Sequence, residues 1–200
     1  MDNTPCTRRN SMPAKKMNKI AMLGLLSASA ATLAQPDLGI ARYTDEGELY
    51  FPADTARWFH ASSVLGGRYA EGEAAPAFDP ANPENTGVVQ MEPQAWQYFM
   101  EHGEYADGTM FLLSFYASEA KSDPQLNGFV QGALQAREIH VIDKGRFTEG
   151  RGFFIYNDPA QRTSAKVPDG SDCVACHTTE GEHDGTFVQF YPHLRDRIGN

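Results

Sequence analysis

Apolar residues along this chain follow two periods, one typical of helices and one typical of strands. The clearest helical pattern lies between Pro93 and Gly103, where Trp96, Phe99 and Met100 occupy positions i, i+3 and i+4. Proline is favoured in the first turn of a helix, and glycine is favoured just after its end. The segment is therefore predicted to be an amphipathic helix with one buried face.

Two further helices are predicted on shorter patterns. Trp58, Ala61 and Leu65 recur at helical spacing within residues 52–67, which start with a proline and end with a glycine pair. A brief helix is expected over residues 192–198, where the chain continues after a proline. The segment 72–85, rich in proline, glycine and alanine, is expected to be an exposed loop.

Strand-like patterns are more numerous than helical ones. The predicted strands cover residues 86–91, 109–116, 136–143, 152–156 and 186–191. In the third strand, Ile139 and Val141 share one face, while Glu138 and His140 share the other. Because strands are clustered and helices are few, the sequence predicts a single α+β domain with a mainly antiparallel β-sheet and a few short helices.

The amino terminus has the pattern of an export signal. Lys15, Lys16 and Lys19 precede an apolar run from Ile20 to Ala34, with small residues before Gln35. A membrane-spanning helix needs about 20 apolar residues, so the run is short for a retained anchor, which is the alternative. We expect a signal peptide over residues 1–34, an irregular segment over 35–50, a domain over 51–200 and a periplasmic location.

The charge of the chain limits the classes of partner that it can bind. Without the expected leader, the chain keeps 12 basic and 25 acidic residues, a net charge of −13. Nucleic-acid binding needs basic patches, so nucleic acid is excluded as a partner. A redox partner protein with a basic surface remains open, and plain solubility explains the acidic balance equally well. The 41% apolar content is that of an ordinary globular core.

The strongest chemical signal is the run Cys173-Val174-Ala175-Cys176-His177. This C-x-x-C-H pattern is the attachment site of a c-type haem, in which two thiols bind the porphyrin and the histidine ligates the iron. Zinc would need a second ligand pair, and the chain has no second cysteine pair because Cys6 lies in the expected leader. A thioredoxin-like site would need a βαβ context, whereas residues 168–172 indicate a polar, turn-rich loop. One covalent haem c is therefore the predicted cofactor, with His177 as its metal ligand.

The surroundings of the haem are less strongly determined. No methionine follows His177, so the ligand pattern of small electron-transfer cytochromes is missing. Phe111, Leu113 and Phe115 share one strand face, and they either line an apolar haem pocket or belong to the core. Glu138 and His140 are candidate distal groups that could move protons. Alternatively, His140 ligates the iron as a sixth ligand, or both side chains face solvent.

The order of these features resembles the cytochrome P-460 family and the related cytochrome c′-beta proteins. The resemblance covers residues 52–198 and rests on the following segments: 93–103, 107–116, 136–143, 152–154, the late C-x-x-C-H and 187–192. It implies a homodimer, and a five-coordinate haem with His177 below the iron and an open distal face. Hydroxylamine-oxidising members carry a cross-linking lysine at about the position of Leu113, so this cross-link is not expected here.

These observations leave three functions open. The leading one is a haem c protein that binds nitric oxide or a similar small diatomic or nitrogen-oxide ligand. The second is an oxidoreductase acting on hydroxylamine, nitric oxide or peroxide. The third is a six-coordinate electron carrier.

Overall fold

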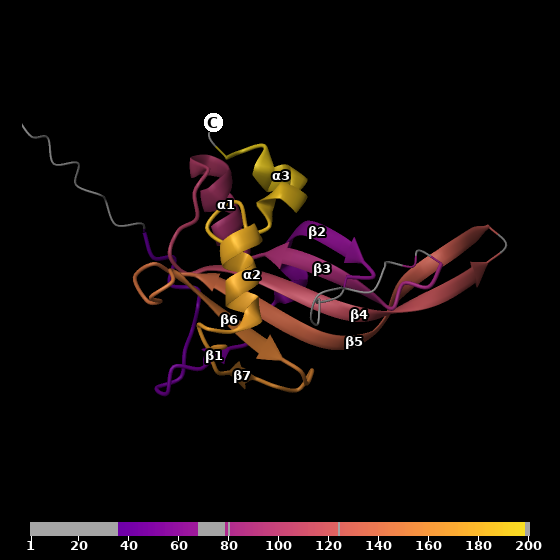
Figure 1. The fold of residues 1–200 in the computed structure, drawn as a ribbon, viewed down its shortest axis with the longest axis horizontal. Coiled ribbons are helices and arrows are strands. Elements are labelled where there is room, and N and C mark those ends of the chain that lie inside the picture. The colour runs from indigo at the N-terminus through magenta and orange to yellow at the C-terminus, as the bar shows by residue number, and fades with distance from the viewer. Residues whose placement is uncertain (1–35, 68–78, 80, 124, 199–200) are drawn as a thin grey trace, which may run out of the picture. The chain divides into compact units, whose positions relative to one another are not determined.

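The largest element of the protein is a five-stranded antiparallel sheet (Figure 1). The computed structural model describes residues 36–67, 79, 81–123 and 125–198, so the expected signal peptide and most of the expected loop at 72–85 lie outside the described residues. The sheet has the order β2-β3-β4-β5-β6. Its strands are β2 (Phe59–Leu65), β3 (Asn85–Met91), β4 (Thr109–Asp123), β5 (Leu126–Ile142) and β6 (Arg151–Tyr156).

The remaining elements are short. Two small strands, β1 (Leu49–Tyr50) and β7 (Thr163–Ser164), pair with each other. The helices are α1 (Pro93–His102), α2 (Asp172–Glu180) and α3 (Pro192–Arg195), with 3₁₀ turns η1 (Thr55–Arg57) and η2 (Val188–Phe190). The predicted α+β class with a mainly antiparallel sheet is confirmed. Among the described residues, no helix has the length and apolar character needed to cross a bilayer.

Helix α1 forms where the apolar pattern predicts it. The Glu92 carboxylate accepts hydrogen bonds from the backbone N–H groups of Gln94 (2.7 Å) and Ala95 (2.9 Å), which caps the first turn. Gly103 ends the helix with φ of 71°, a left-handed conformation that glycine adopts without steric cost. Phe99 is fully buried on the inner face, so the helix prediction for residues 93–103 is confirmed.

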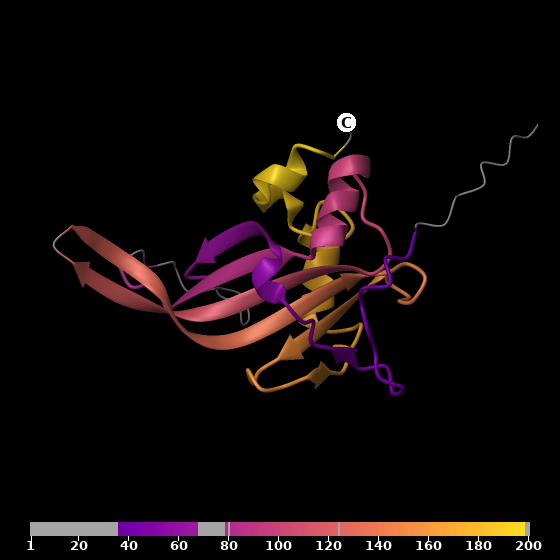
Figure 2. The ribbon, with the colours of Figure 1, turned by 180° about the vertical axis from the view of Figure 1, so that it is seen from behind.

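The sheet separates two apolar clusters, and alternate residues of β4 supply each of them. Phe111 joins Phe99 and Leu194 in a cluster under helices α1 and α3. Met110 and Leu112 point the other way, into a cluster with residues of the amino-terminal segment such as Leu49. The two views show α1, α2 and α3 together on one face of the sheet (Figure 1) and the chain around η1 on the other (Figure 2).

Strands β4 and β5 are longer than the sequence pattern predicts. The predicted strands at 109–116 and 136–143 are confirmed, but pairing continues outward to Asp123 and Leu126. Beyond Ala117, no third described strand pairs with β4, and the resulting two-stranded hairpin projects from the sheet (Figure 1). The outer part is rich in small and polar residues, so it lacks the apolar alternation that marks a strand in the sequence.

The helix predicted over residues 52–67 is wrong, because most of this segment is strand β2. Trp58 packs in the cluster on one face of the sheet, and Ala61 packs in the cluster on the other. Leu65 is 45% exposed. The three residues therefore share no buried face, and their helical spacing is a coincidence of sequence.

The strand predicted over residues 186–191 is also wrong, because η2 occupies its centre. Val188 and Tyr191 are buried three residues apart in the same cluster, whereas Phe190 is 65% exposed. This spacing is helical. The predicted brief helix that follows is confirmed as α3, although it ends at Arg195.

Phe99 offers a test of the core under α1. Its ring stacks on that of Tyr105 with 4.6 Å between centroids, and the side chain is fully buried. We expect Phe99→Ala to lower the free energy of unfolding by about 3–5 kcal/mol, because it leaves a cavity in the core. The matched control is Phe129→Ala on the projecting hairpin, where the ring is 38% exposed and the loss should stay below about 1 kcal/mol. Chemical denaturation measures both, and equal losses would contradict this account of the core.

Candidate functional site

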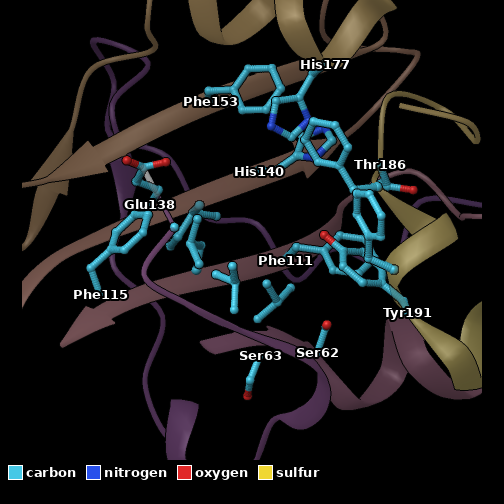
Figure 3. A pocket seen from close by; sticks show the side chains of 17 residues that line it. Ser62, Ser63, Phe111, Phe115, Glu138, His140, Phe153, His177, Thr186 and Tyr191 are labelled. Atoms are coloured by element: carbon cyan, nitrogen blue, oxygen red, sulfur yellow. The ribbon is translucent and has the colours of Figure 1, made fainter. Parts of the chain in front are cut away.

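A cavity of about 580 Å³ opens on the face of the sheet that carries the helices (Figure 3). Its floor comes from β2, β3, β4 and β5, and its walls come from β6, α2 and the segment around η2. Most lining side chains are apolar or aromatic. Phe111, Leu113 and Phe115 all line it, so the strand face singled out in the sequence does border a pocket.

His177 reaches this cavity from helix α2. The helix begins after Ser171, whose hydroxyl accepts a hydrogen bond from the Val174 backbone N–H (3.5 Å). The expectation that the C-x-x-C-H motif lies in a loop is therefore wrong: the turn-rich residues precede the motif, and Cys173 to His177 are helical. A helix places this side chain in a defined direction, toward the cavity.

The protonation state of His177 follows from its contacts. Its Nδ1 lies 2.6 Å from the carbonyl oxygen of Gly185, which can only accept, so Nδ1 carries the proton and donates. Burial lowers the pKa of His177 below its ordinary value, so the ring is neutral near neutral pH. Nε2 is then the nitrogen left with a lone pair for a metal ion, which is the usual arrangement of a ligating histidine.

Hydrogen bonds between buried hydroxyl groups stabilise the turn that contains Gly185. Gly185 has φ of 72°, a left-handed conformation suited to glycine. The Thr186 hydroxyl donates to the carbonyl oxygen of His183 (2.7 Å), and the hydroxyl of fully buried Tyr105 then donates to Thr186 Oγ1 (3.0 Å). Tyr105 and Thr186 were not predicted as site residues, because they are 81 positions apart and belong to no sequence motif.

The two cysteines of the motif are free thiols at different depths. Cys176 is exposed, and Cys173 is of intermediate burial. Burial, followed by the charge of Glu138, raises the pKa of Cys173. Glu138 and His177 line the cavity, whereas neither cysteine does.

Glu138 and His140 both line the cavity, so the fold brings the two polar candidates to the same pocket as His177. His140 is 7% exposed, which makes the solvent-facing alternative wrong for this residue. Its ring stacks on that of Phe153 with 4.4 Å between centroids, and its centroid lies 5.2 Å from that of the His177 ring. Burial lowers the pKa of His140 well below its ordinary value, and its Nε2 is buried without a hydrogen-bond partner.

Ser62 and Ser63 line the cavity at the end away from His177 (Figure 3). Sequence reasoning missed them, because it assigned their segment to a helix. Leu113 is part of the lining, and no residue of the lining is a lysine. Lys144 instead pairs with Asp184 (3.2 Å), and Lys166 pairs with Asp169.

Comparison with known proteins shows which family the chain belongs to. A family model described as cytochrome P460 matches residues 69–188, which is more than half of the chain. The chain belongs to the cytochrome P460 family. Membership makes it a haem protein. No curated protein matches the chain significantly.

The residues of the site fit a haem. The cavity volume lies within the range of about 300–1,000 Å³ that is usual for cofactor pockets, and its lining suits an apolar macrocycle. The donor set is one neutral imidazole with two free thiols on the same helix. Within the described residues, no group of three or more Cys, His, Asp or Glu side chains could hold a metal ion without a cofactor.

The buried hydroxyl pair Tyr105–Thr186 can be tested by a double-mutant cycle. We expect Thr186→Val to lower the free energy of unfolding by about 1–3 kcal/mol, because it leaves the Tyr105 hydroxyl buried without a partner. Adding Tyr105→Phe removes that hydroxyl, so the double variant should lose less than the sum of the two single variants. The control cycle uses Thr86 and Ser118, whose hydroxyls lie 3.1 Å apart in a half-buried position. Additive losses at Tyr105 and Thr186 would contradict the coupling.

Proposed function

We propose that this protein is an exported cytochrome with one covalent haem c, whose iron is five-coordinate and binds nitric oxide or a similar small uncharged ligand. The observation that carries the proposal is the neutral His177 imidazole, fixed through Nδ1 at the wall of an apolar cavity. Cys173 and Cys176 would form the thioethers, and His177 Nε2 would ligate the iron. When bound, the haem supplies an iron with one axial position for the ligand.

The apolar strand face supports selection of a small uncharged ligand. Phe111, Leu113 and Phe115 present no hydrogen-bonding groups, so water and anions that enter beside them lose solvation without compensation. A diatomic gas loses little solvation in such a place. The cavity would then select nitric oxide because it excludes water and anions, which are more strongly hydrated.

The six-coordinate electron carrier has less support. A second histidine ligand would have to be separated from His177 by the haem. His140 and His177 instead lie next to each other. The Phe153 ring contacts both, with centroid distances of 4.4 Å to His140 and 4.5 Å to His177. His140 is therefore placed to pack beside the proximal ligand, where its neutral ring adds no charge.

One observation favours the second candidate function, an oxidoreductase. Glu138 is an acid–base group that lines the cavity, at the strand position directly opposite Leu113. A carboxyl group there could take protons from hydroxylamine when ionised, or give them to peroxide when protonated. The lining holds no lysine at the cross-link position, which favours ligand binding over hydroxylamine oxidation.

The proposal also covers the location of the protein and its partners. We propose export to the periplasm by the amino-terminal signal, because haem c attachment needs an unfolded chain with reduced thiols. We further propose a homodimer and, for electron exchange, a redox partner with a basic surface complementary to the acidic chain. Sedimentation of the mature protein measures the first of these associations.

The deciding experiment is the absorption spectrum of the mature ferric and ferrous protein. High-spin iron without added ligand, which converts on addition of nitric oxide, is the expected result. Low-spin iron without ligand would support the electron carrier, and a red-shifted, unusual haem band would reveal a cross-link despite Leu113. A colourless protein with two free thiols from a host able to mature cytochromes would end the proposal.

Variants of the motif separate attachment from ligation. We expect Cys173→Ser combined with Cys176→Ser to abolish covalent haem, so that the denatured chain has the mass of the polypeptide alone. His177→Ala should retain the haem mass but lose the five-coordinate spectrum, because the thioethers remain without an axial ligand. The control is His193→Ala on α3, which is exposed and should change neither mass nor spectrum. Haem retention in the double cysteine variant would contradict covalent attachment at this motif.

Glu138→Gln separates ligand binding from turnover. An uncharged diatomic needs no proton, so we expect the variant to bind nitric oxide with an affinity close to that of the parent. Any turnover of hydroxylamine or peroxide should fall about 100-fold, since the amide cannot carry the proton. Stopped-flow binding and steady-state kinetics measure the two quantities. A parallel fall in nitric oxide affinity would mean that Glu138 acts in binding itself.

A further inference from the structure

A second cavity, of about 350 Å³, lies on the opposite face of the same sheet. Its floor is a row across three neighbouring strands, because Val88 pairs with Ser114 and Ser114 pairs with Arg137. The neighbours of Ser114 along β4, Leu113 and Phe115, point the other way and line the cavity of His177, which is the proposed haem cavity. The two cavities therefore lie back to back across β4 and β5.

The Arg137 guanidinium is held in a fixed position in this second cavity. Its plane lies over the ring of Phe51, with 3.7 Å from Cζ to the ring centroid. Its Nη2 donates to the carbonyl oxygen of Pro159 (3.0 Å). Its Nε is buried and has no hydrogen-bond partner. Because Nε is buried, a ligand reaches the guanidinium at its Nη groups, and the contacts with Phe51 and Pro159 hold these in a fixed orientation.

The electrostatic environment of Arg137 favours an anion. No aspartate or glutamate is among the residues that line this cavity, although acidic residues outnumber basic ones 26 to 17 in the chain. Burial, followed by the neighbouring positive charge of Arg162, lowers the pKa of Arg137, while Asp158 has the weakest influence. An arginine keeps its charge in proteins, so two close cations here gain from a bound negative charge.

The remaining lining limits the kind of anion. Val88, Leu112 and Leu134 give the cavity an apolar wall, and further polar groups come from Thr55, Gln90, Ser114, Tyr116 and Gln131. One guanidinium edge matches a carboxylate in shape and charge. Phosphate and sulfate carry more charge and have no apolar part, so the apolar wall would not contribute to their binding.

We propose that this cavity binds a small monocarboxylate with a short aliphatic chain. The carboxylate accepts from the Arg137 guanidinium and from the Ser114 hydroxyl, and the chain packs on Val88, Leu112 and Leu134. This proposal does not depend on the iron, because no residue lines both cavities. It adds a binding site for an organic acid to a protein of the cytochrome P460 family.

Butyrate is the probe, and the mature haem-loaded protein in its ferrous state is the sample. Titration calorimetry should give a Kd of about 1 mM, a value ordinary for a ligand of this size. The haem absorption spectrum, recorded in the same titration, should not change. Butyramide, which has nearly the same shape without the charge, should bind at least about 10-fold more weakly. Phosphate at equal concentration should also bind more weakly than butyrate.

Two variants locate the binding. Arg137→Gln removes the guanidinium and should raise the butyrate Kd about 10- to 100-fold. Ser114→Leu keeps the guanidinium and fills the cavity, so it should prevent binding even if Arg137→Gln fails to fold. The matched control is Arg146→Gln, because Arg146 also lies over an aromatic ring (Tyr43, 3.5 Å) but does not line the cavity. Its Kd should equal that of the parent.

Three outcomes would overturn the proposal. The first is parent protein that does not bind butyrate, or binds butyramide equally well. The second is butyrate binding that survives both Arg137→Gln and Ser114→Leu. The third is a change of the haem spectrum that follows the titration, which would place butyrate at the iron. A protein without haem would overturn the proposed function, yet it would leave this titration meaningful.

Discussion

The hydrogen bond from His177 Nδ1 to the Gly185 carbonyl is the constraint on which the site depends. It fixes the tautomer and the ring orientation, so it decides that Nε2 is the nitrogen available for iron. The bond requires the left-handed turn at Gly185, and that turn is stabilised by the Thr186 hydroxyl and by fully buried Tyr105. Residues with no proposed chemical role of their own therefore determine how the His177 ring is oriented.

The antiparallel pair β4–β5 gives this protein two separate environments. Alternation along each strand sends Leu113 and Glu138 to the cavity of His177, and sends Ser114 and Arg137 to the second cavity on the other face. One face is apolar and aromatic around a neutral imidazole, while the other contains a fixed guanidinium. A shift of one residue in register would exchange these two sets of side chains, so the strand pairing is as important to the site as the C-x-x-C-H motif.

Local sequence predicted the elements in which apolar residues follow a clear helical or strand pattern. Helix α1 was predicted because its apolar residues pack against a single cluster, and the inner parts of β4 and β5 were predicted by apolar runs and alternation. Strand β2 was missed because Trp58 and Ala61 belong to clusters on opposite faces of the sheet, so their spacing carries no information on a common buried face. The outer hairpin was missed because polar and small residues form it. Its backbone hydrogen bonds do not depend on an apolar pattern, so hydropathy does not reveal them.

The sequence by itself determined the candidate residues for haem attachment, because two cysteines and a histidine at the spacing of a haem c motif lie within five consecutive residues. It also determined which side chains share a face of β4 and β5, since strand alternation is local. Only the tertiary structure decided that Glu138 and His140 meet His177, that Tyr105 supports Gly185 across 81 positions, and that Arg137 stands over Phe51. Those contacts join distant segments, and their free energy arises only when packing brings the segments together.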